Sequence, residues 1–331
     1  MAPTRIEFDR ILCPVDFSEF SIRALERAVR LGSWFDARVE VLHVIPFVIP
    51  AGAGLPYFPA PPQVTLVQRE QAERDLADLV APFLGEGVPI ETKVLEGEPW
   101  RVIQEEAEAL PAGLMVMGTH GRSGFEHLLL GSVTEKVVRR APCPVLTVGE
   151  VPPHPRTGPL FRRILCAADL TQASERTLEL ALSLATENDA RITLLHVVES
   201  LPGETGSRLY LAVPEIGPLR RDLVEHARAQ LRKAVPDEAR DFCNVTERVE
   251  VGSAWSEILR VADEVDADLI VMGAHTGGAL GRMLFGSTSS HVVRRAACPV
   301  LVIHETGKER PTAHVAEAVA VASVKTKGGG R

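Results

Sequence analysis

The chain of 331 residues carries 44 acidic and 36 basic side chains, a formal net charge of −8, and 45% hydrophobic residues. This is the composition of a globular protein with room for two domains, and its negative charge argues against a broad cationic surface for nucleic acid or anionic lipid. No apolar run reaches the ~18 residues of a membrane span, and the charged start of the chain (Arg5, Glu7, Asp9) does not read as a secretory signal. Five widely spaced cysteines without a CxxC pair predict buried thiols in a reducing cytoplasm.

In the first half of the chain, short apolar runs alternate with segments of helical periodicity. The pattern predicts strands at residues 11–15, 38–45, 88–95, 114–117 and 144–148, and helices around residues 24–31, 98–110 and 131–140. Such apolar runs are typical of strands buried on both faces, and their alternation with helices predicts a parallel sheet. A sheet of this kind binds its ligand outside the carboxyl ends of the strands.

The same order of elements occurs twice. Residues 8–46 begin FDRILCPVDFS and residues 161–199 begin FRRILCAADLT, and the two segments align without a gap. Residues 94–148 and 249–303 also match, ending in APCPVLTV and AACPVLVI. A repeat of this length indicates a duplicated globular unit.

We therefore divide the chain into a first domain at residues 1–150, a second at residues 160–304, and a tail at residues 305–331. The segment VPPHPRTGP between the domains is too rich in proline to continue a strand or a helix. The polar, glycine-ended tail is expected to be flexible, apart from a short helix around residues 314–324.

The loop that leaves the fourth predicted strand reads GTHGRSGFEHLLLGS, starting at Gly118. Gly118 and Gly121 predict a tight turn with exposed backbone amides, and Ser132 and Thr134 add hydroxyls where the next helix begins. A helix N-terminus supplies unpaired N–H donors and partial positive charge, so the segment predicts a phosphate cradle. The alternative is that the glycines only turn the chain and Ser132 only caps the helix. The position of the loop after a parallel strand favours phosphate binding.

Neither a Walker A motif nor a GxGxxG fingerprint occurs in the sequence. The predicted cradle therefore lacks the lysine and the catalytic groups of fast P-loop hydrolases. This favours a site that holds a nucleotide over one that turns it over rapidly.

The spacing G-2x-G-9x-G-S of this loop, with the opening ILCPVDFS, the LHV of the second strand and the closing APCPVLTV, resembles the universal stress protein family. The resemblance covers both repeats. It implies an α/β fold of two tandem Rossmann-like (adenine nucleotide alpha hydrolase-like) domains, each a five-stranded parallel sheet of order 3-2-1-4-5 flanked by helices. It also implies that the fifth strands pair, here residues 145–148 with 300–303, as an internal pseudo-dimer, and that two chains associate as a homodimer. Pairing would protect apolar edge strands.

The resemblance also implies an adenine-nucleotide ligand: ATP, or ADP or AMP, with Mg²⁺ or Mn²⁺ on its phosphates. Asp16 would accept hydrogen bonds from the ribose or the adenine amine, or else only cap the following helix. His120 would donate to a phosphate, or else be a solvated loop residue, and His43 is expected to make a local hydrogen bond. The implied contacts in the first domain are Pro14, Val15, Asp16, Val44, Met117, Gly118, His120, Gly121, Gly131, Ser132, Val133 and Thr134.

The second domain departs from this pattern. Thr276 replaces the second glycine of the loop, where a β-branched residue would be strained at positive φ. Ala167 and Ala168 replace a proline and a valine, which leaves more room around the base. We therefore expect the first domain to bind nucleotide better, with weaker candidates in the second at Ala168, Asp169, Val197, Met272, Gly273, His275, Gly286, Ser287 and Thr288.

Three functions are compatible with the sequence. The first is an ATP-binding universal stress protein, a stress or signalling module that acts through domain pairing and an unidentified protein partner. The second is a slow ATPase or nucleotide-processing enzyme, although the HxGH signature of adenylyl-transferring relatives does not occur in the chain. The third is a scaffold for a non-nucleotide ligand in the second domain.

Overall fold

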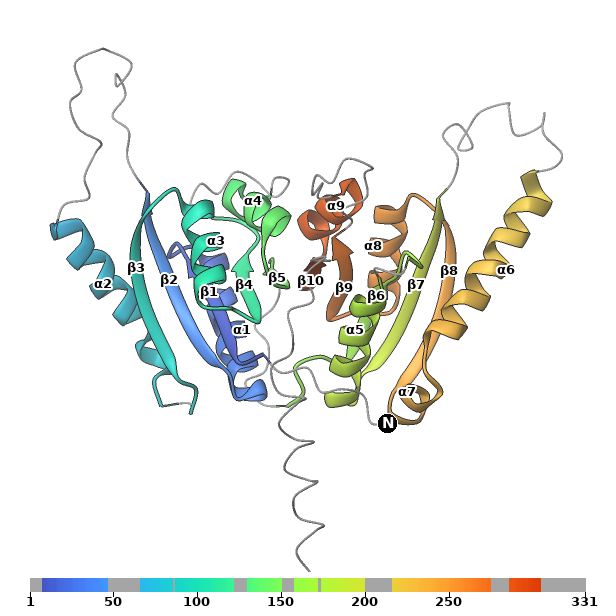
Figure 1. Cartoon of the computed structure of the whole chain (residues 1–331), viewed down its shortest axis with the longest axis horizontal. Coiled ribbons are helices and arrows are strands. Elements are labelled where there is room, and N and C mark those ends of the chain that lie inside the picture. Colours follow the sequence, from blue (N-terminus) through green and yellow to red (C-terminus); the bar gives the residue numbers. More distant parts are fainter. Residues whose placement is uncertain are drawn as a thin grey trace, which may run out of the picture.

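The strands of both copies join in one sheet in the computed structural model, which describes residues 8–46, 66–85, 87–121, 130–150, 158–171, 174–199, 216–274 and 286–304 (Figure 1). The strands of the first copy are β1 (Arg10–Val15), β2 (Arg38–Pro46), β3 (Ile90–Gly97), β4 (Leu114–Gly118) and β5 (Val145–Val148). Those of the second copy are β6 (Arg163–Ala167), β7 (Arg191–Glu199), β8 (Asn244–Gly252), β9 (Leu269–Ala274) and β10 (Val300–His304).

The helices complete each copy. The first copy contains α1 (Glu19–Phe35), α2 (Leu66–Val80), a short 3₁₀ helix (Ala81–Phe83), α3 (Pro99–Ala109) and α4 (Ser132–Arg140). The second contains α5 (Glu175–Glu187), α6 (Ile216–Ala234), α7 (Asp237–Phe242), α8 (Ala254–Glu264) and α9 (Ser287–Arg295). None of the helices in the described residues is long and apolar enough to cross a membrane.

The sheet has ten strands in the order β3-β2-β1-β4-β5-β10-β9-β6-β7-β8. Each copy is thus a parallel sheet of order 3-2-1-4-5, which confirms the predicted fold class. The two fifth strands meet antiparallel at the centre, with Leu146 opposite Leu301 and Thr147 opposite Val300. The Thr147 hydroxyl donates to the Val300 carbonyl at 3.1 Å. Both fifth strands are therefore interior strands rather than open edges.

Two apolar cores lie on opposite faces of the sheet. One face is packed by α1 and α2 of the first copy and by α5, α6 and α7 of the second. The other face is packed by α3, α4, α8 and α9. The buried strands explain the unbroken apolar runs in the sequence, because both faces of the sheet are covered. All five cysteines are buried and free, as predicted.

The structure contains helices that the periodicity did not predict, in the two segments that the repeats do not share. Helix α2 buries only Ala72, Leu76 and Val80 against the core, so most of its surface is polar. A stripe this narrow gives a weak helical signal. Strand β3 begins at Ile90, two residues later than predicted. The predicted tail helix at residues 314–324 and most of the linker segment lie outside the described residues.

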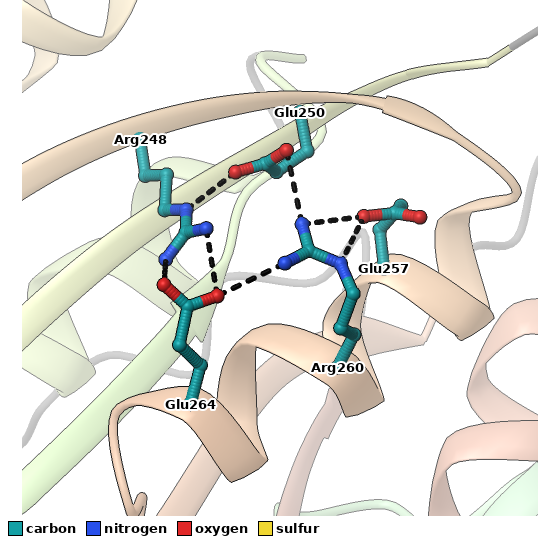
Figure 2. A network of polar contacts seen from close by, with 5 residues as sticks. All are labelled: Arg248, Glu250, Glu257, Arg260 and Glu264. Carbon is teal, nitrogen blue, oxygen red and sulfur yellow. Dashed lines mark hydrogen bonds and ion pairs between the residues drawn. The ribbon is translucent and has the colours of Figure 1, made fainter.

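A network of charged side chains fastens α8 to β8 in the second copy (Figure 2). Arg248 of β8 contacts Glu264 of α8 at 2.9 Å, and Arg260 of α8 contacts Glu250 of β8 at 3.0 Å and Glu257 at 2.7 Å. Hydrogen bonds to Glu264 and Glu250 raise the pKa of Arg248 above its usual value. Several ion pairs that share partners fix geometry better than one isolated surface pair. The network therefore fixes the second half of α8 against β8.

Candidate functional site

The turn after the first strand of each copy is built around an aspartate. In the first copy, Oδ1 of Asp16 accepts from the amide of Ser18 at 3.1 Å and from its hydroxyl at 2.6 Å. Ser18, not Asp16, is the N-cap of α1. In the second copy, Oδ1 of Asp169 accepts from the amide and the hydroxyl of Thr171 at 2.9 and 2.8 Å. One carboxylate oxygen thus orders the turn in both copies.

The residue after each aspartate has a left-handed backbone. Phe17 has a φ of 63° and Leu170 a φ of 61°. Side chains of this size adopt such angles only when their surroundings require it, and the strain gathers at binding sites more often than elsewhere. Two independent copies of the same strained turn place both aspartates at the carboxyl edge of the sheet.

The histidine of each second strand has a local role. Nδ1 of His43 is 2.8 Å from the carbonyl oxygen of Val15, and Nδ1 of His196 is 2.8 Å from that of Ala168. These bonds confirm the predicted local hydrogen bond of His43. They tie the ends of the first and second strands together, so the backbone next to each aspartate is held from two sides.

Gly118 proves to be the last residue of β4, opposite Val148, rather than the first residue of the turn. A Cβ atom on Gly118 would lie 2.8 Å from the carbonyl carbon of Phe20 and 3.0 Å from its oxygen. Gly118 is therefore required by the close approach of α1 to β4. A Cβ atom on Gly121 would lie 2.6 Å from Oδ2 of Asp16, so the turn rests directly on the aspartate.

Two hydrogen-bond donors of the predicted cradle in the first copy are already engaged within the protein. The amide of Gly131 donates to the carbonyl of Thr119 at 2.8 Å, and the buried hydroxyl of Thr134 donates to the carbonyl of Gly118 at 2.8 Å. Neither group can then donate to a phosphate, which corrects the role predicted for the Thr134 hydroxyl. A contact between Gly131 and the ligand stays a prediction. In the second copy, the Ser289 hydroxyl makes the equivalent bond to Gly273 at 3.4 Å.

The N-termini of α4 and α9 are open in the part of the chain that the structure describes. Their N-caps are Gly131 and Gly286, and no described side chain caps either helix. The interpretation of Ser132 as a cap is therefore wrong, since it is the first helical residue and is exposed. With a glycine cap, the amides of the first helical residues have no side-chain acceptor and are directed at the carboxyl edge. Ser287 and Thr288 occupy the same positions in α9 as Ser132 and Val133 in α4.

His120 follows β4 and is partly buried. Its Nδ1 is 2.9 Å from the hydroxyl of Thr119, and its ring lies 5.0 Å from that of Phe20. These contacts pack His120 against the start of α1 rather than leaving it in a freely solvated loop. A contact between His120 and a phosphate stays a prediction, and its counterpart His275 lies outside the described residues.

In the second copy, the candidate residues surround one cavity of about 310 Å³. Cavities of this size suit small-molecule ligands. The predicted residues in its wall are Ala168, Asp169, Val197, Met272, Gly273, Gly286, Ser287 and Thr288. In the first copy, the corresponding positions lie at the ends of β1, β2 and β4 and at the start of α4, namely Pro14, Val15, Asp16, Val44, Met117 and Ser132 to Thr134.

The cavity also has lining residues that the sequence did not single out. Ala254 and Ile258 come from α8, the helix that the charged network positions, and Glu199 comes from the end of β7. The sequence did contain a signal for the α8 residues. A helix that follows a strand of a parallel sheet begins at the carboxyl edge, and α8 follows β8. No group of three or more His, Cys, Asp or Glu side chains in the described residues is arranged to hold a metal ion.

The fold and the site together define a duplicated, doubly wound α/β protein with a small-molecule cavity at the carboxyl edge of its sheet. The sequence matches the model of the universal stress protein family at residues 7–149 and again at residues 160–304. The chain therefore belongs to the universal stress protein family, in a tandem form, which confirms the resemblance seen in the sequence.

Individual relatives agree with this assignment. A universal stress protein of Methanocaldococcus jannaschii is 38% identical over 144 residues, which are 43% of this chain and 82% of that protein. One from Mycolicibacterium smegmatis is 27% identical over 297 residues, covering 88% of this chain and 96% of the relative. Among solved structures, a universal stress protein from Archaeoglobus fulgidus superposes with a TM-score of 0.60 at 25% identity, over 92% of this chain and 98% of its own.

Proposed function

We propose that the chain binds an adenine nucleotide (ATP, ADP or AMP) at the carboxyl edge of its sheet. We further propose that it acts as a nucleotide-dependent stress or signalling module in the cytoplasm, through domain pairing and a protein partner rather than fast catalysis. The observation that carries the proposal is the cavity of the second copy, which joins an apolar wall, an aspartate and an open helix N-terminus in one space.

The two ends of this cavity suit the two ends of a nucleotide. Ala167, Ala168 and Met272 form an apolar wall against which a flat purine can pack. Asp169 is a hydrogen-bond acceptor for ribose hydroxyls. The phosphates would then reach the amides of Ser287 and Thr288 at the start of α9, where the helix dipole favours negative charge. A Mg²⁺ or Mn²⁺ ion would bind through the phosphates, because the described residues offer no cluster of protein ligands.

The first copy supports the same proposal by its repeated geometry. Asp16, His43 and the glycine-capped start of α4 make the same contacts as their counterparts in the second copy. The predicted preference of nucleotide for the first copy rests on the glycine at position 121, which the second copy replaces with Thr276. That threonine lies outside the described residues, so the preference stays a prediction.

Replacing the serine that begins α4 or α9 with glutamate tests the site in each copy separately. A carboxylate at the first helical position favours the helix dipole, so Ser132→Glu and Ser287→Glu should fold normally. The same charge would repel a phosphate placed there, and we expect ATP to bind at least about 30-fold more weakly to the altered copy. Isothermal titration calorimetry measures the affinity of each variant.

Adenosine is the matched control ligand, because it lacks phosphates and should lose little affinity in either variant. A larger loss of ATP affinity in Ser132→Glu than in Ser287→Glu would agree with the predicted preference for the first copy. If the double variant binds ATP as tightly as the parent chain, the assignment of the phosphate site is wrong.

A further inference from the structure

A larger cavity, of about 840 Å³, lies at the opposite edge of the sheet. Trp34, at the end of α1 of the first copy, forms one wall. The other walls come from the second copy, where Arg162, Arg163 and Arg191 line the cavity at the starts of β6 and β7. The cavity therefore lies on the seam between the two copies, and the candidate nucleotide sites share none of its residues.

The wall of this cavity carries more positive than negative charge. Its three arginines face two carboxylates, Glu187 and Asp189. The nearby Asp268 is already engaged, because its two oxygens accept the backbone amides of Arg162 and Arg163 at 2.8 and 3.0 Å. Within the described residues, no carboxylate lies at ion-pair distance from the guanidinium of Arg162 or of Arg191.

Two further arginines on the same face of α1 as Trp34 add to this charge. Arg30 donates to the carbonyl of Gly158 at 3.1 Å, in the cavity wall. Arg27 is only 6% exposed, and its guanidinium lies 5.7 Å from the ring of Phe161. Nη1 of Arg27 has no hydrogen-bond partner among the described residues. Burial and the neighbouring Arg30 lower the pKa of Arg27 to about 10.

The second copy does not repeat this cluster of arginines and tryptophan on α1. In the gapless alignment, Arg27, Arg30 and Trp34 correspond to Leu180, Ser183 and Glu187. The second copy thus has neither the two cations nor the indole at these positions. Burial of the Arg27 cation is costly, and the nearby charge of Asp268 offsets only part of the cost, since the pKa of Arg27 remains lowered. An anion bound in the seam would add favourable charge and stabilise the folded chain.

We propose that the seam cavity is an anion site that binds a multivalent phosphate. Arg162 and Arg191 make the direct contacts, since the planar guanidinium suits two phosphate oxygens at once. Trp34 forms an aromatic wall of the cavity. Arg27 and Arg30, on the same face of α1, add positive charge without lining the cavity. The ligand is either inorganic pyrophosphate or the diphosphate group of a larger ester.

Trp34 provides a direct optical test. The chain has three tryptophans, so the Trp100→Phe/Trp255→Phe variant reports from Trp34 alone. Pyrophosphate is expected to change its emission saturably, whereas sodium chloride of equal ionic strength is not. Arg162→Gln and Arg191→Gln are each expected to weaken the binding about tenfold. Arg176→Gln, at the far end of α5, is the matched control and should bind like the parent.

Comparing two ligands distinguishes the sources of the phosphate. Tighter binding of ADP than of pyrophosphate would indicate that the cavity recognises an organic diphosphate ester, and equal binding would indicate that it recognises the diphosphate group alone.

The test is independent of the nucleotide sites. Ser132→Glu and Ser287→Glu should leave the Trp34 response unchanged, so failure of the proposed nucleotide site would not affect this test. Should the tryptophan variant fail to fold, a rise in the thermal midpoint of the parent chain with pyrophosphate, lost in the Arg162→Gln/Arg191→Gln variant, is the second readout. Unaltered binding after removal of both arginines, or an equal effect of sodium chloride, overturns the proposal.

Discussion

Replacing Gly118 with valine is expected to lower the free energy of unfolding of the first copy by about 3 kcal/mol or more. The new Cβ atom would meet the carbonyl carbon of Phe20 at 2.8 Å, closer than nonbonded atoms approach. The obstacle is backbone within α1, which cannot turn aside as a side chain can. Helix α1 would have to move away from β4. The chain would then lose the packing of α1 on β1 and β4, and the Asp16 turn that precedes α1 would be displaced. Urea unfolding measures the change in midpoint.

Gly149→Ala is the matched control for this substitution. A Cβ atom on Gly149 would have its nearest neighbours at 3.6 and 3.9 Å, which is ordinary contact. Its unfolding free energy should stay within about 0.5 kcal/mol of the parent value. An equally small effect for Gly118→Val would show that the close approach of α1 to β4 does not exist.

The second large effect is expected at His304, the last residue of β10, which is 4% exposed. Its Nε2 bonds to the carbonyl of Val138 in the last turn of α4, so a side chain of the second copy caps a helix of the first. His304→Ala removes the bond, leaves that carbonyl without its partner and opens a cavity. We expect a loss of about 2–4 kcal/mol of unfolding free energy. Differential scanning calorimetry checks this through the unfolding midpoint.

The same residue predicts how stability depends on pH. Burial lowers the pKa of His304 below its usual value, although bonds to the backbone of Val138 and Cys143 oppose the shift. The unfolded chain then binds the proton more readily than the folded chain. The contribution of His304 is complete above its ordinary pKa of about 6.5, and it declines as the pH falls from there towards the lower pKa of the folded state.

His304→Gln separates the bond from the titration, because the amide can still donate to Val138 but takes up no proton. Its unfolding free energy, measured by urea from pH 5 to 8, should vary less with pH than that of the parent chain. Identical pH profiles for the two proteins would rule out His304 as the source of the dependence.

The coupling between copies is relevant to the proposed signalling role. Helix α4 has the candidate phosphate site at its N-terminus and the His304 contact at its C-terminus. Nucleotide bound at one end would therefore act on a helix that the other copy holds at the opposite end. The first copy has glycine, Gly149, where the second has His304, so only one of the two helices receives this contact.

The sequence predicted the core of the fold well because its strands are buried on both faces and read as unbroken apolar runs. The order of the strands followed from the family resemblance rather than from periodicity. Helix α2 was missed because only a narrow stripe of it is buried. The role of Gly118 was misjudged because the approach of Phe20 is a tertiary contact, which no local spacing records.

The candidate site was predicted in part for a similar reason. Asp169 lies just after β6, Met272 lies near the end of β9 and Ser287 begins α9, and the fold brings the three together at one edge. Glu199 and the α8 residues of the cavity wall carry no motif. The seam cavity was out of reach of the sequence, because Trp34 of the first copy meets Arg162 and Arg191 of the second only through tertiary packing, which no local spacing records.

Titration of the full chain with ATP in a calorimeter tests the central claim most directly. The account predicts saturable heat from the parent chain, and loss of that heat in the Ser132→Glu/Ser287→Glu double variant, while adenosine still binds to both. Absence of heat from the parent chain with ATP, ADP and AMP at millimolar concentration would contradict it.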